Sequence, residues 1–133
     1  MDKIYIPKLN YKVLCNCSTY NQAQYITDTM NGFTMQKTNF PFVCYIIDDA
    51  STDGEPEVIK AYLNEYFDME NANYEEIETA NIIIAKHKDN RNCTFAVYFL
   101  KHNLWKEPEL KNTHIRPWRE HSEYEAFCEG DDY

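Results

Sequence analysis

The segment FVCYIIDDASTDG, residues 42–54, joins a continuous apolar run, two adjacent carboxylates and the start of a helix. Its first six residues are apolar or aromatic, which predicts a strand covered on both faces, as in a parallel sheet. In open α/β sheets, the groups just past the carboxyl ends of such strands face the ligand crevice. Asp48 and Asp49 occupy that place. We therefore expect at least one of these two carboxylates to bind a ligand.

A helix start follows the two acids. Thr52 and Glu55 have the T-x-x-E spacing of a capping box, and Pro56 falls in the first turn, where its missing N–H costs nothing. The alternative role of the two acids is to cap this helix and oppose its dipole. The polar residues 51–53 already suit that role, which favours ligand binding by the acids.

The composition indicates one soluble globular domain. At 133 residues the chain is long enough to bury roughly two-thirds of its unfolded surface around a single core. No apolar run approaches the roughly 18 residues of a membrane span, and the amino-terminal residues lack the apolar core of a secretory signal. Five cysteines without a C-x-x-C pair indicate free thiols in a reducing compartment. We expect a cytoplasmic location, with peripheral attachment to the inner membrane face in a longer protein.

The net charge of −9 argues against nucleic acid or an anionic membrane surface as the main partner of this segment, since both require a basic face. The acids gather in two patches, at residues 68–78 and 120–132. We interpret the first patch as a solvated loop and the second as part of a site.

Residues 11–17, YKVLCNC, are apolar enough to form a first strand inside the sheet. Cys15 and Cys17 would project to the same face, because side chains alternate along a strand. We expect them to fill the core; a metal pair is the alternative, although no second pair stands nearby at zinc spacing.

A helix is expected next. Asn21 and Gln24 match the N-cap and N3 preferences, and the helix should end near Met35. Apolar residues at three- and four-residue steps give this helix one face for packing on the sheet: Ala23, Ile26, Met30 and Phe33.

The strand, the helix and the strand at residues 42–47 would complete a β-α-β unit, which is right-handed almost without exception. Ser18 and Tyr20 follow the first strand, and Asp48 and Asp49 follow the second. One crevice at the carboxyl edge of the sheet could therefore be lined by both sets of side chains.

The middle of the chain is predicted from its periodicity. Residues 58–67 carry an apolar stripe at helical spacing, which we expect to be core. Residues 68–80 are polar and acidic and are predicted as loop or frayed helix. Residues 82–87 and 93–100 are β-rich and are separated by turn residues, which indicates two neighbouring strands.

Residues 103–122 show no clean period, and Pro108 and Pro117 argue against one long helix, so we expect a loop with a short helix. His114, Trp118 and His121 could form a site. Isolated histidines without supporting groups are, however, more often surface or packing residues.

A last strand is predicted at residues 124–128, followed by Glu129-Gly130-Asp131-Asp132. Carboxylates gathered at a strand end repel one another unless a cation neutralises them, and hard oxygen ligands suit Mg²⁺ or Mn²⁺. An acidic tail without a ligand is the alternative.

Three segments, STYN with YI at residues 18–26, IDDASTD at 47–53 and YEAFCEGDD at 124–132, together resemble family 2 glycosyltransferases. The resemblance implies the GT-A fold, a Rossmann-like, mostly parallel α/β sheet with helices on both faces. It also implies an inverting, metal-dependent transfer of a sugar from a nucleotide-diphosphate donor, with a UDP-sugar favoured, to a cell-surface polysaccharide or glycolipid acceptor.

The resemblance also implies residue roles. Ser18 and Tyr20 would flank the nucleobase, and Asp49 would accept a hydrogen bond from it. Glu129 would lie near the ribose in the nucleotide site, while Asp131, with Asp132 beside it, would bind the Mg²⁺ or Mn²⁺ ion that bridges the diphosphate.

Three departures from the family pattern affect these expectations. Glu129 replaces the usual first Asp of the D-x-D motif, so that its longer side chain would contact ribose or water rather than metal. Ala50 replaces a common Gly, which is a minor change if its φ is negative. The sequence ends at Tyr133. The resemblance therefore implies that residues 1–133 form the nucleotide-sugar-binding portion, without the acceptor half and the general base, and that they do not turn over acceptor alone.

Other function classes were weighed on the same residues. A catalytically inactive GT-A-like binding domain, or an acidic protein-interaction domain, would keep the fold without the chemistry. Phosphoryl transfer, with Asp48 and Asp49 as metal ligands, would need a lysine at the end of a later strand, where Lys86 and Lys101 are the candidates. A dinucleotide-binding domain is disfavoured, because G-x-G-x-x-G is absent.

Overall fold

The computed structural model describes residues 4–129. Along the chain it contains six strands, three α-helices and one 3₁₀ turn within that range. The elements are β1 (Tyr11–Thr19), α1 (Ile26–Thr34), β2 (Phe42–Asp48), α2 (Glu55–Tyr66), η1 (Met69–Asn71), β3 (Asn73–Glu76), β4 (Ala80–Lys86), β5 (Cys93–Leu100), α3 (Pro108–Glu120) and β6 (Ser122–Glu129).

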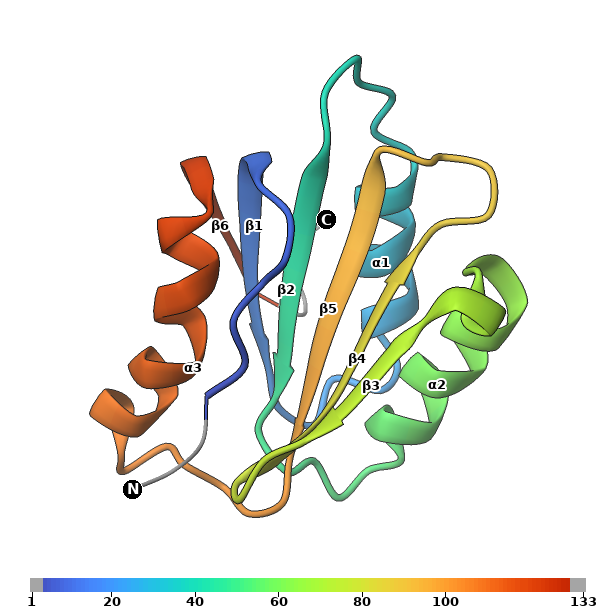
Figure 1. The fold of residues 1–133 in the computed structure, drawn as a ribbon. Helices are drawn as coiled ribbons and strands as arrows, with labels where there is room; N and C mark the ends of the chain where they lie inside the picture. Colours follow the sequence, from blue (N-terminus) through green and yellow to red (C-terminus); the bar gives the residue numbers. More distant parts are fainter. Residues whose placement is uncertain (1–3, 130–133) are drawn as a thin grey trace.

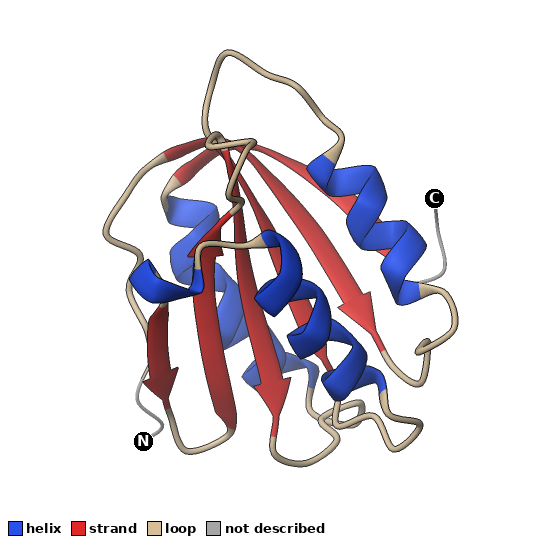
Figure 2. Ribbon diagram, turned by 90° about the vertical axis from the view of Figure 1, so that its right-hand side faces the viewer, coloured by secondary structure: helices blue, strands red, loops and turns tan. Residues whose placement is uncertain are grey.

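All six strands form one sheet in the order β3-β4-β5-β2-β1-β6. The pairs β5·β2, β2·β1 and β1·β6 are parallel, whereas β4 pairs antiparallel with both β3 and β5. The carboxyl ends of the parallel strands lie at the bottom of Figure 1. Figure 2 shows the sheet as a twisted fan with helices on both faces. The predicted class, a mostly parallel α/β sheet covered on both faces, is confirmed.

The core divides into two layers, one on each face of the sheet. Helices α1 and α2 cover one face, where their apolar residues pack with alternate residues of β1, β2 and β5. Helix α3 covers the other face, together with the amino-terminal segment that crosses in front of the strands in Figure 1. Every residue of β2 is buried, as the apolar run predicts, because this strand lies between two parallel neighbours and under helices on both faces.

The crossovers change direction at β1. Helix α1 leads from β1 to β2, whereas α3 leads from β5 across to β6 on the other side of β1. Parallel α/β sheets bind ligands outside the carboxyl ends of the strands at such a switch point. The topology therefore directs the search for a site to the loops that follow β1, β2 and β5.

The predicted starts of the first two helices are wrong. Helix α1 begins at Ile26 instead of after Asn21, and Asn21 itself has a left-handed backbone with φ of 53°. Helix α2 begins at Glu55 with Gly54 at its N-cap, so Thr52 and Glu55 do not form a capping box; Pro56 lies in the first turn, as predicted. The polar residues of these two loops bond to each other across the sheet edge, and these tertiary contacts displace the helix starts from the predicted positions.

Two predictions in the second half of the chain also need correction. The acidic segment 68–80 contains the 3₁₀ turn and the edge strand β3, which is too short and polar to carry a strand signal of its own. The segment 103–122 contains the 13-residue helix α3. Pro108 begins this helix, where its missing N–H is harmless.

Pro117 lies inside α3, at a position that ordinarily disfavours a helix by about 3 kcal/mol. Its helix nevertheless continues to Glu120, because one face of α3 is deeply buried. Ile115 and Trp118 are 4% and 1% exposed, and the Trp118 Nε1–H donates to the Tyr98 hydroxyl at 2.8 Å. Burial of these large apolar side chains outweighs the local penalty.

The aromatic cluster beneath α1 and α2 provides a test of this packing. Phe95 is fully buried, with its ring centroid 4.4 Å from Phe67 and 6.2 Å from Phe33. We expect Phe95→Ala to lower the free energy of unfolding by about 3–5 kcal/mol, because it removes buried surface and leaves a cavity. Phe127→Ala is the matched control, because Phe127 is 74% exposed. Equal losses for the two variants in urea unfolding would contradict this assignment of the core.

Candidate functional site

A hollow of about 450 Å³ opens at the carboxyl edge of the sheet. It is lined by Tyr20 from the loop after β1, Asp49 from the loop after β2, and Asn103 and Trp105 from the loop after β5. The Tyr20 and Trp105 side chains are 47% and 69% exposed, whereas Asp49 is only 4% exposed. The hollow thus combines two accessible aromatic rings with a buried carboxylate, all at the switch-point edge.

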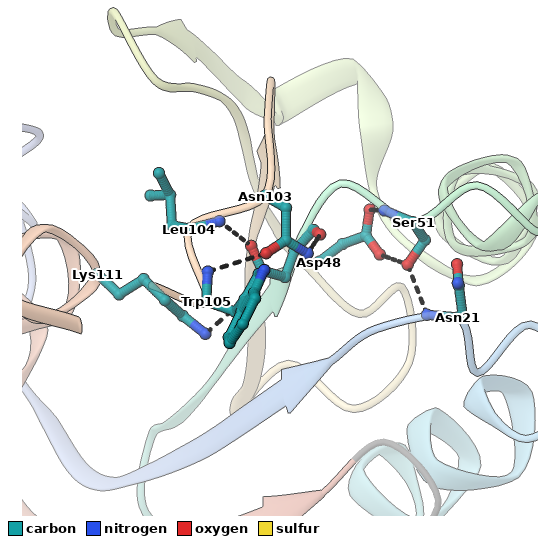
Figure 3. Close-up of polar contacts among 8 residues, drawn as sticks. Asn21, Asp48, Ser51, Asn103, Leu104, Trp105 and Lys111 are labelled. Atoms are coloured by element: carbon teal, nitrogen blue, oxygen red, sulfur yellow. Dashed lines mark hydrogen bonds and ion pairs between the residues drawn. The ribbon is translucent and has the colours of Figure 1, made fainter. Parts of the chain in front are cut away.

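Asp49 fixes the loop that carries Trp105. Its Oδ1 accepts a hydrogen bond from the Leu104 N–H at 2.7 Å, and its backbone carbonyl accepts one from Asn103 Nδ2 at 2.9 Å. The Asn103 Oδ1 in turn accepts from the Trp105 N–H at 2.9 Å. Figure 3 shows these residues gathered around the acids that end β2. The carboxylate therefore both lines the hollow and positions one of its aromatic walls.

The Lys111 ammonium lies 3.5 Å from Asp49 Oδ2. Lys111 belongs to α3, so this ion pair connects the helix to the acid at the carboxyl end of β2. The lysine at 25% and the carboxylate at 6% side-chain exposure are both largely shielded from water. The contact places one positive charge beside Asp49.

Asp48 turns away from this cluster toward Ser51 (Figure 3). Its carboxylate accepts hydrogen bonds from the hydroxyl and, at 3.4 Å, from the backbone N–H of Ser51. The pKa of Asp48 is raised from 3.8 to about 6. Burial is the main cause, the nearby charges of Glu55 and Asp53 also raise the pKa, and the Ser51 hydrogen bonds lower it. Asp48 thus bonds within the turn after β2, whereas Asp49 lines the hollow.

Glu55 joins the first loop to the second. It is fully buried, and its carboxylate accepts hydrogen bonds from the Thr19 hydroxyl at 2.5 Å, the Gln22 N–H at 2.7 Å and the Ser51 hydroxyl at 3.2 Å. Thr19 and Gln22 flank Tyr20 in the chain. The buried carboxylate therefore holds the Tyr20 loop against the loop that carries Asp49.

Three further hydrogen bonds cross between the same loops. The Asn21 N–H donates to Ser51 Oγ at 2.9 Å, the Thr52 N–H donates to Asn21 Oδ1 at 2.8 Å, and the Ala23 N–H donates to Asp53 Oδ2 at 3.0 Å. These are the polar residues that suggested helix caps in the sequence. They serve as contacts between the loops, and Asp53 Oδ1 in addition accepts a hydrogen bond at 3.1 Å from the N–H of Glu55, the first residue of α2.

Ala50 has a left-handed backbone, with φ of 58°. The expectation that an alanine here is a minor change depended on a negative φ, so that expectation is wrong. An L-residue with a Cβ is strained in this region, where glycine is not. The strained residue lies directly between Asp49 and the Ser51 contacts, in the turn that shapes the site.

The other predicted nucleotide and metal residues lie outside the lining of the hollow or outside the described residues. Ser18 is half-buried in β1 and does not line the hollow, but its register partner in β6 is Glu129. The backbone of Glu129 therefore lies at the same sheet edge as Ser18. Asp131 and Asp132, predicted as metal ligands, lie outside the described residues. Among the side chains that the structure describes, no group of three or more His, Cys, Asp or Glu is arranged to hold a metal ion.

The histidine and tryptophan candidates of α3 are packing residues. His114 is 1% exposed, and its Nε2 lies 2.8 Å from the Thr79 hydroxyl. His121 Nδ1 lies 2.9 Å from the backbone carbonyl of Pro117. With Trp118 buried against Tyr98, these side chains belong to the core and to the end of the helix.

The lysines considered for phosphoryl transfer do not approach the acids. Lys86 ends β4, which runs antiparallel, so it lies at the opposite edge of the sheet. Lys101 follows β5 but pairs with Glu76 at 2.5 Å. The lysine that does reach Asp49 is Lys111, which the sequence did not indicate because only a short helix was expected in this region.

Two wall residues of the hollow, Asn103 and Trp105, were also missed. They lie in the loop between β5 and α3, where the sequence shows no motif. The position of this loop after a buried strand was the available signal, since such loops form the ligand crevice of parallel sheets.

Residues 17–78 match the sequence model of glycosyl transferase family 2. Over this segment the chain is similar to that family. The segment runs from the end of β1 to the acidic region before β4, and it contains Tyr20, Asp49 and the contacts that join their loops. The match confirms the resemblance and supports glycosyl transfer as the general class of reaction.

Curated relatives include uncharacterized protein Mb1547 of Mycobacterium bovis and uncharacterized protein Rv1520 of Mycobacterium tuberculosis. Each is 46% identical to this chain over 48 residues, which are 36% of this chain and 14% of the relative. The similarity therefore covers a small part of these longer proteins. No solved structure matches the chain. None of the helices in the described part of the chain is both long and apolar enough to cross a membrane.

The strain at Ala50 can be measured. We expect Ala50→Gly to raise the free energy of unfolding by about 0.5–1 kcal/mol, because glycine adopts the left-handed backbone without strain and this gain exceeds its entropic cost. Ala72→Gly is the matched control: Ala72 has φ of −70°, so the same change should destabilise the protein. A lower free energy of unfolding in Ala50→Gly would contradict the interpretation that the backbone of Ala50 is strained.

The raised pKa of Asp48 predicts a pH-dependent stability. Between its ordinary pKa of 3.8 and its folded pKa of about 6, the folded protein holds a proton that the unfolded chain releases, so stability falls as the pH rises through this window. Relative to Asp48→Asn, we expect the wild type to lose about 2–3 kcal/mol between roughly pH 4 and pH 7. Urea unfolding of both proteins across this range measures the difference. Parallel pH profiles would show that Asp48 is not responsible.

Proposed function

We propose that this chain binds a nucleotide-diphosphate sugar, specifically a UDP-sugar, as the donor of an inverting, metal-dependent glycosyl transfer. The acceptor would be a saccharide or glycolipid of the cell surface, which places the reaction in polysaccharide biosynthesis. The observation that carries this proposal is the hollow lined by two accessible aromatic side chains and a buried carboxylate. The family match over the same loops supports the reaction class.

The chemistry of the hollow favours a flat heterocycle with a ring N–H. The Tyr20 and Trp105 rings provide faces on which a base can stack, and stacking contributes about 1–3 kcal/mol per base. A carboxylate accepts hydrogen bonds only, and Asp49 Oδ1 is already engaged by Leu104. Its other oxygen, Oδ2, lies 3.5 Å from the Lys111 ammonium and keeps a second lone pair for a further donor, such as uracil N3–H. Cytosine has no proton at that ring position, so the pair of groups favours uracil.

The diphosphate end of the donor would lie along the same sheet edge. The β1·β6 register brings Glu129 beside Ser18, and the next carboxylates along the chain are Asp131 and Asp132. Oxygen donors of this kind fit Mg²⁺ or Mn²⁺. Asp131 and Asp132 would hold the ion, which would offset the charge that develops on the leaving diphosphate.

Calorimetric titration of the protein with UDP and CDP, with and without Mn²⁺, tests this proposal. We expect Mn²⁺-dependent binding of UDP that is at least about tenfold tighter than binding of CDP, because only uracil offers its ring N–H to Asp49. Trp105→Ala should weaken UDP about tenfold or more, through lost stacking. Asp131→Ala should remove the dependence on Mn²⁺.

Tyr74→Ala is the control for the loss of an aromatic side chain, because Tyr74 is 60% exposed on the edge strand β3, away from the hollow. It should bind UDP like the wild type. Absence of UDP binding with Mn²⁺, or equal affinity in Trp105→Ala, would refute the donor site and favour an interaction domain that keeps only the fold.

A further inference from the structure

Three cysteine thiols form a row beneath α1 and α2. Cys15 of β1, Cys44 of β2 and Cys93 of β5 all lie in the core layer on that face of the sheet. The thiols of Cys15 and Cys44 are in hydrogen-bonding contact, and so are those of Cys44 and Cys93. All three are free thiols. None of the three lines the proposed donor site, so their contacts have a role, if any, that is separate from donor binding.

The strand register distinguishes the two contacts. Cys15 and Cys44 are direct partners in the parallel pair β1·β2. Neighbouring strands lie about 4.8 Å apart, which is within the roughly 4.4–6.8 Å that separates the Cα atoms of a disulfide. The partner of Cys93 is Phe42, two residues before Cys44, so those two cysteines face each other only diagonally. The geometry therefore favours a bond between Cys15 and Cys44.

Access from solvent also differs among the thiols. Cys44 and Cys93 are fully buried, whereas Cys15 is half-buried and lines a surface hollow of about 300 Å³. The other walls of this hollow include Phe33 and Phe40, so it admits a small uncharged molecule more readily than an ion. An oxidant that enters from the surface reaches Cys15 first, and Cys44 lies beside it on the neighbouring strand.

The pKa values of the two thiols also indicate that Cys15 reacts before Cys44. The hydrogen bond from the Cys44 thiol lowers the pKa of Cys15, although partial burial opposes this effect. Burial raises the pKa of Cys44 well above the ordinary value. At neutral pH, Cys15 is thus the better source of a nucleophilic thiolate, and Cys44 keeps its proton.

We propose that Cys15 and Cys44 are the site of a reversible disulfide that forms on reaction with a hydroperoxide. The Cys15 thiolate attacks a peroxide oxygen, the O–O bond breaks, and the hydroxide that leaves takes a proton to become water, which leaves a sulfenic acid on Cys15. The Cys44 sulfur then attacks the Cys15 sulfur, the S–OH bond breaks, and the Cys44 proton leaves with that hydroxide as a second water. The two thiols are oxidised by two electrons, and hydrogen peroxide is reduced to two waters.

The bond would connect the two strands that lead to the donor hollow. Tyr20 follows β1 and Asp49 follows β2. A covalent link between these strands would therefore restrict the distance between the two loops that carry Tyr20 and Asp49. The inference about the thiols stands independently of the proposed donor, because it rests on the interior of the sheet.

The test uses the 133-residue chain carrying Cys128→Ser, because Cys128 is the backbone register partner of Cys17 and its removal leaves one register-matched pair of cysteines, Cys15 and Cys44. The protein is treated with hydrogen peroxide, alkylated with iodoacetamide without reduction, digested and analysed by mass spectrometry. We expect one cross-linked pair of peptides, joined through Cys15 and Cys44 and lighter by two hydrogen atoms, that dithiothreitol separates. Cys17 and Cys93 should be recovered alkylated.

Variants assign the roles of the two thiols. Cys15→Ser should abolish the cross-link, and Cys44→Ala should leave a Cys15 sulfenic acid that dimedone traps. Cys93→Ala is the matched control, since it removes the other buried neighbour of Cys44 and should leave the cross-link unchanged. A link between Cys44 and Cys93, or recovery of Cys15 as sulfinic acid or as unreacted thiol in the parent protein, would overturn the proposal without reliance on any variant.

Discussion

The site depends on one buried carboxylate. Glu55 begins α2, yet its side chain turns back to accept hydrogen bonds from the loop that follows β1. Hydrogen bonds to a charged group contribute about 1.5–3 kcal/mol each, and a buried acid that lost them would be costly to keep in the interior. The two loops at the carboxyl edge therefore form a single unit. Tyr20 and Asp49, which are distant in sequence, face one hollow because Glu55 holds that unit together.

The residues of this edge serve structure and recognition together. Asp49 lines the hollow, but it also fixes the backbone of Leu104 and pairs with Lys111. Ala50, beside it, keeps a left-handed backbone that disfavours any residue other than glycine. Strain of this kind persists only where the surrounding contacts determine the turn completely, and such places are often functional. Here the surrounding contacts are the hydrogen bonds of Ser51 to Asp48 and Asn21.

Most of the sheet could be predicted from the sequence, because its strands are runs of apolar residues and a buried strand leaves few alternatives. The fully buried β2 and the hairpin of β4 and β5 are examples. The helix starts could not be predicted, because Asn21 and residues 51–53 satisfy each other across space, and the local capping preference carries no information about such contacts. The length of helix α3 was underestimated because Pro117 opposes the helix locally, and the burial of Trp118 in the folded protein outweighs that preference.

The candidate site was predictable in part, for the same reason. Tyr20 and Asp49 directly follow recognisable strands, so topology alone places them at one edge. Trp105 and Lys111 depend on the path of the chain after β5 and on a helix that the sequence pattern obscures. A sequence shows which strands end at an edge, but it does not show which distant loop folds over that edge.

The two tryptophans of this chain occupy contrasting surroundings. Trp118 is enclosed in the core with its ring N–H bonded to Tyr98, whereas Trp105 stands 69% exposed at the mouth of the hollow. The indole of Trp118 therefore emits from an apolar environment, at shorter wavelength, and the indole of Trp105 emits from water. The intrinsic fluorescence of the protein consequently divides into an internal reference and a reporter of the hollow, so occupancy of that edge is readable without any added dye.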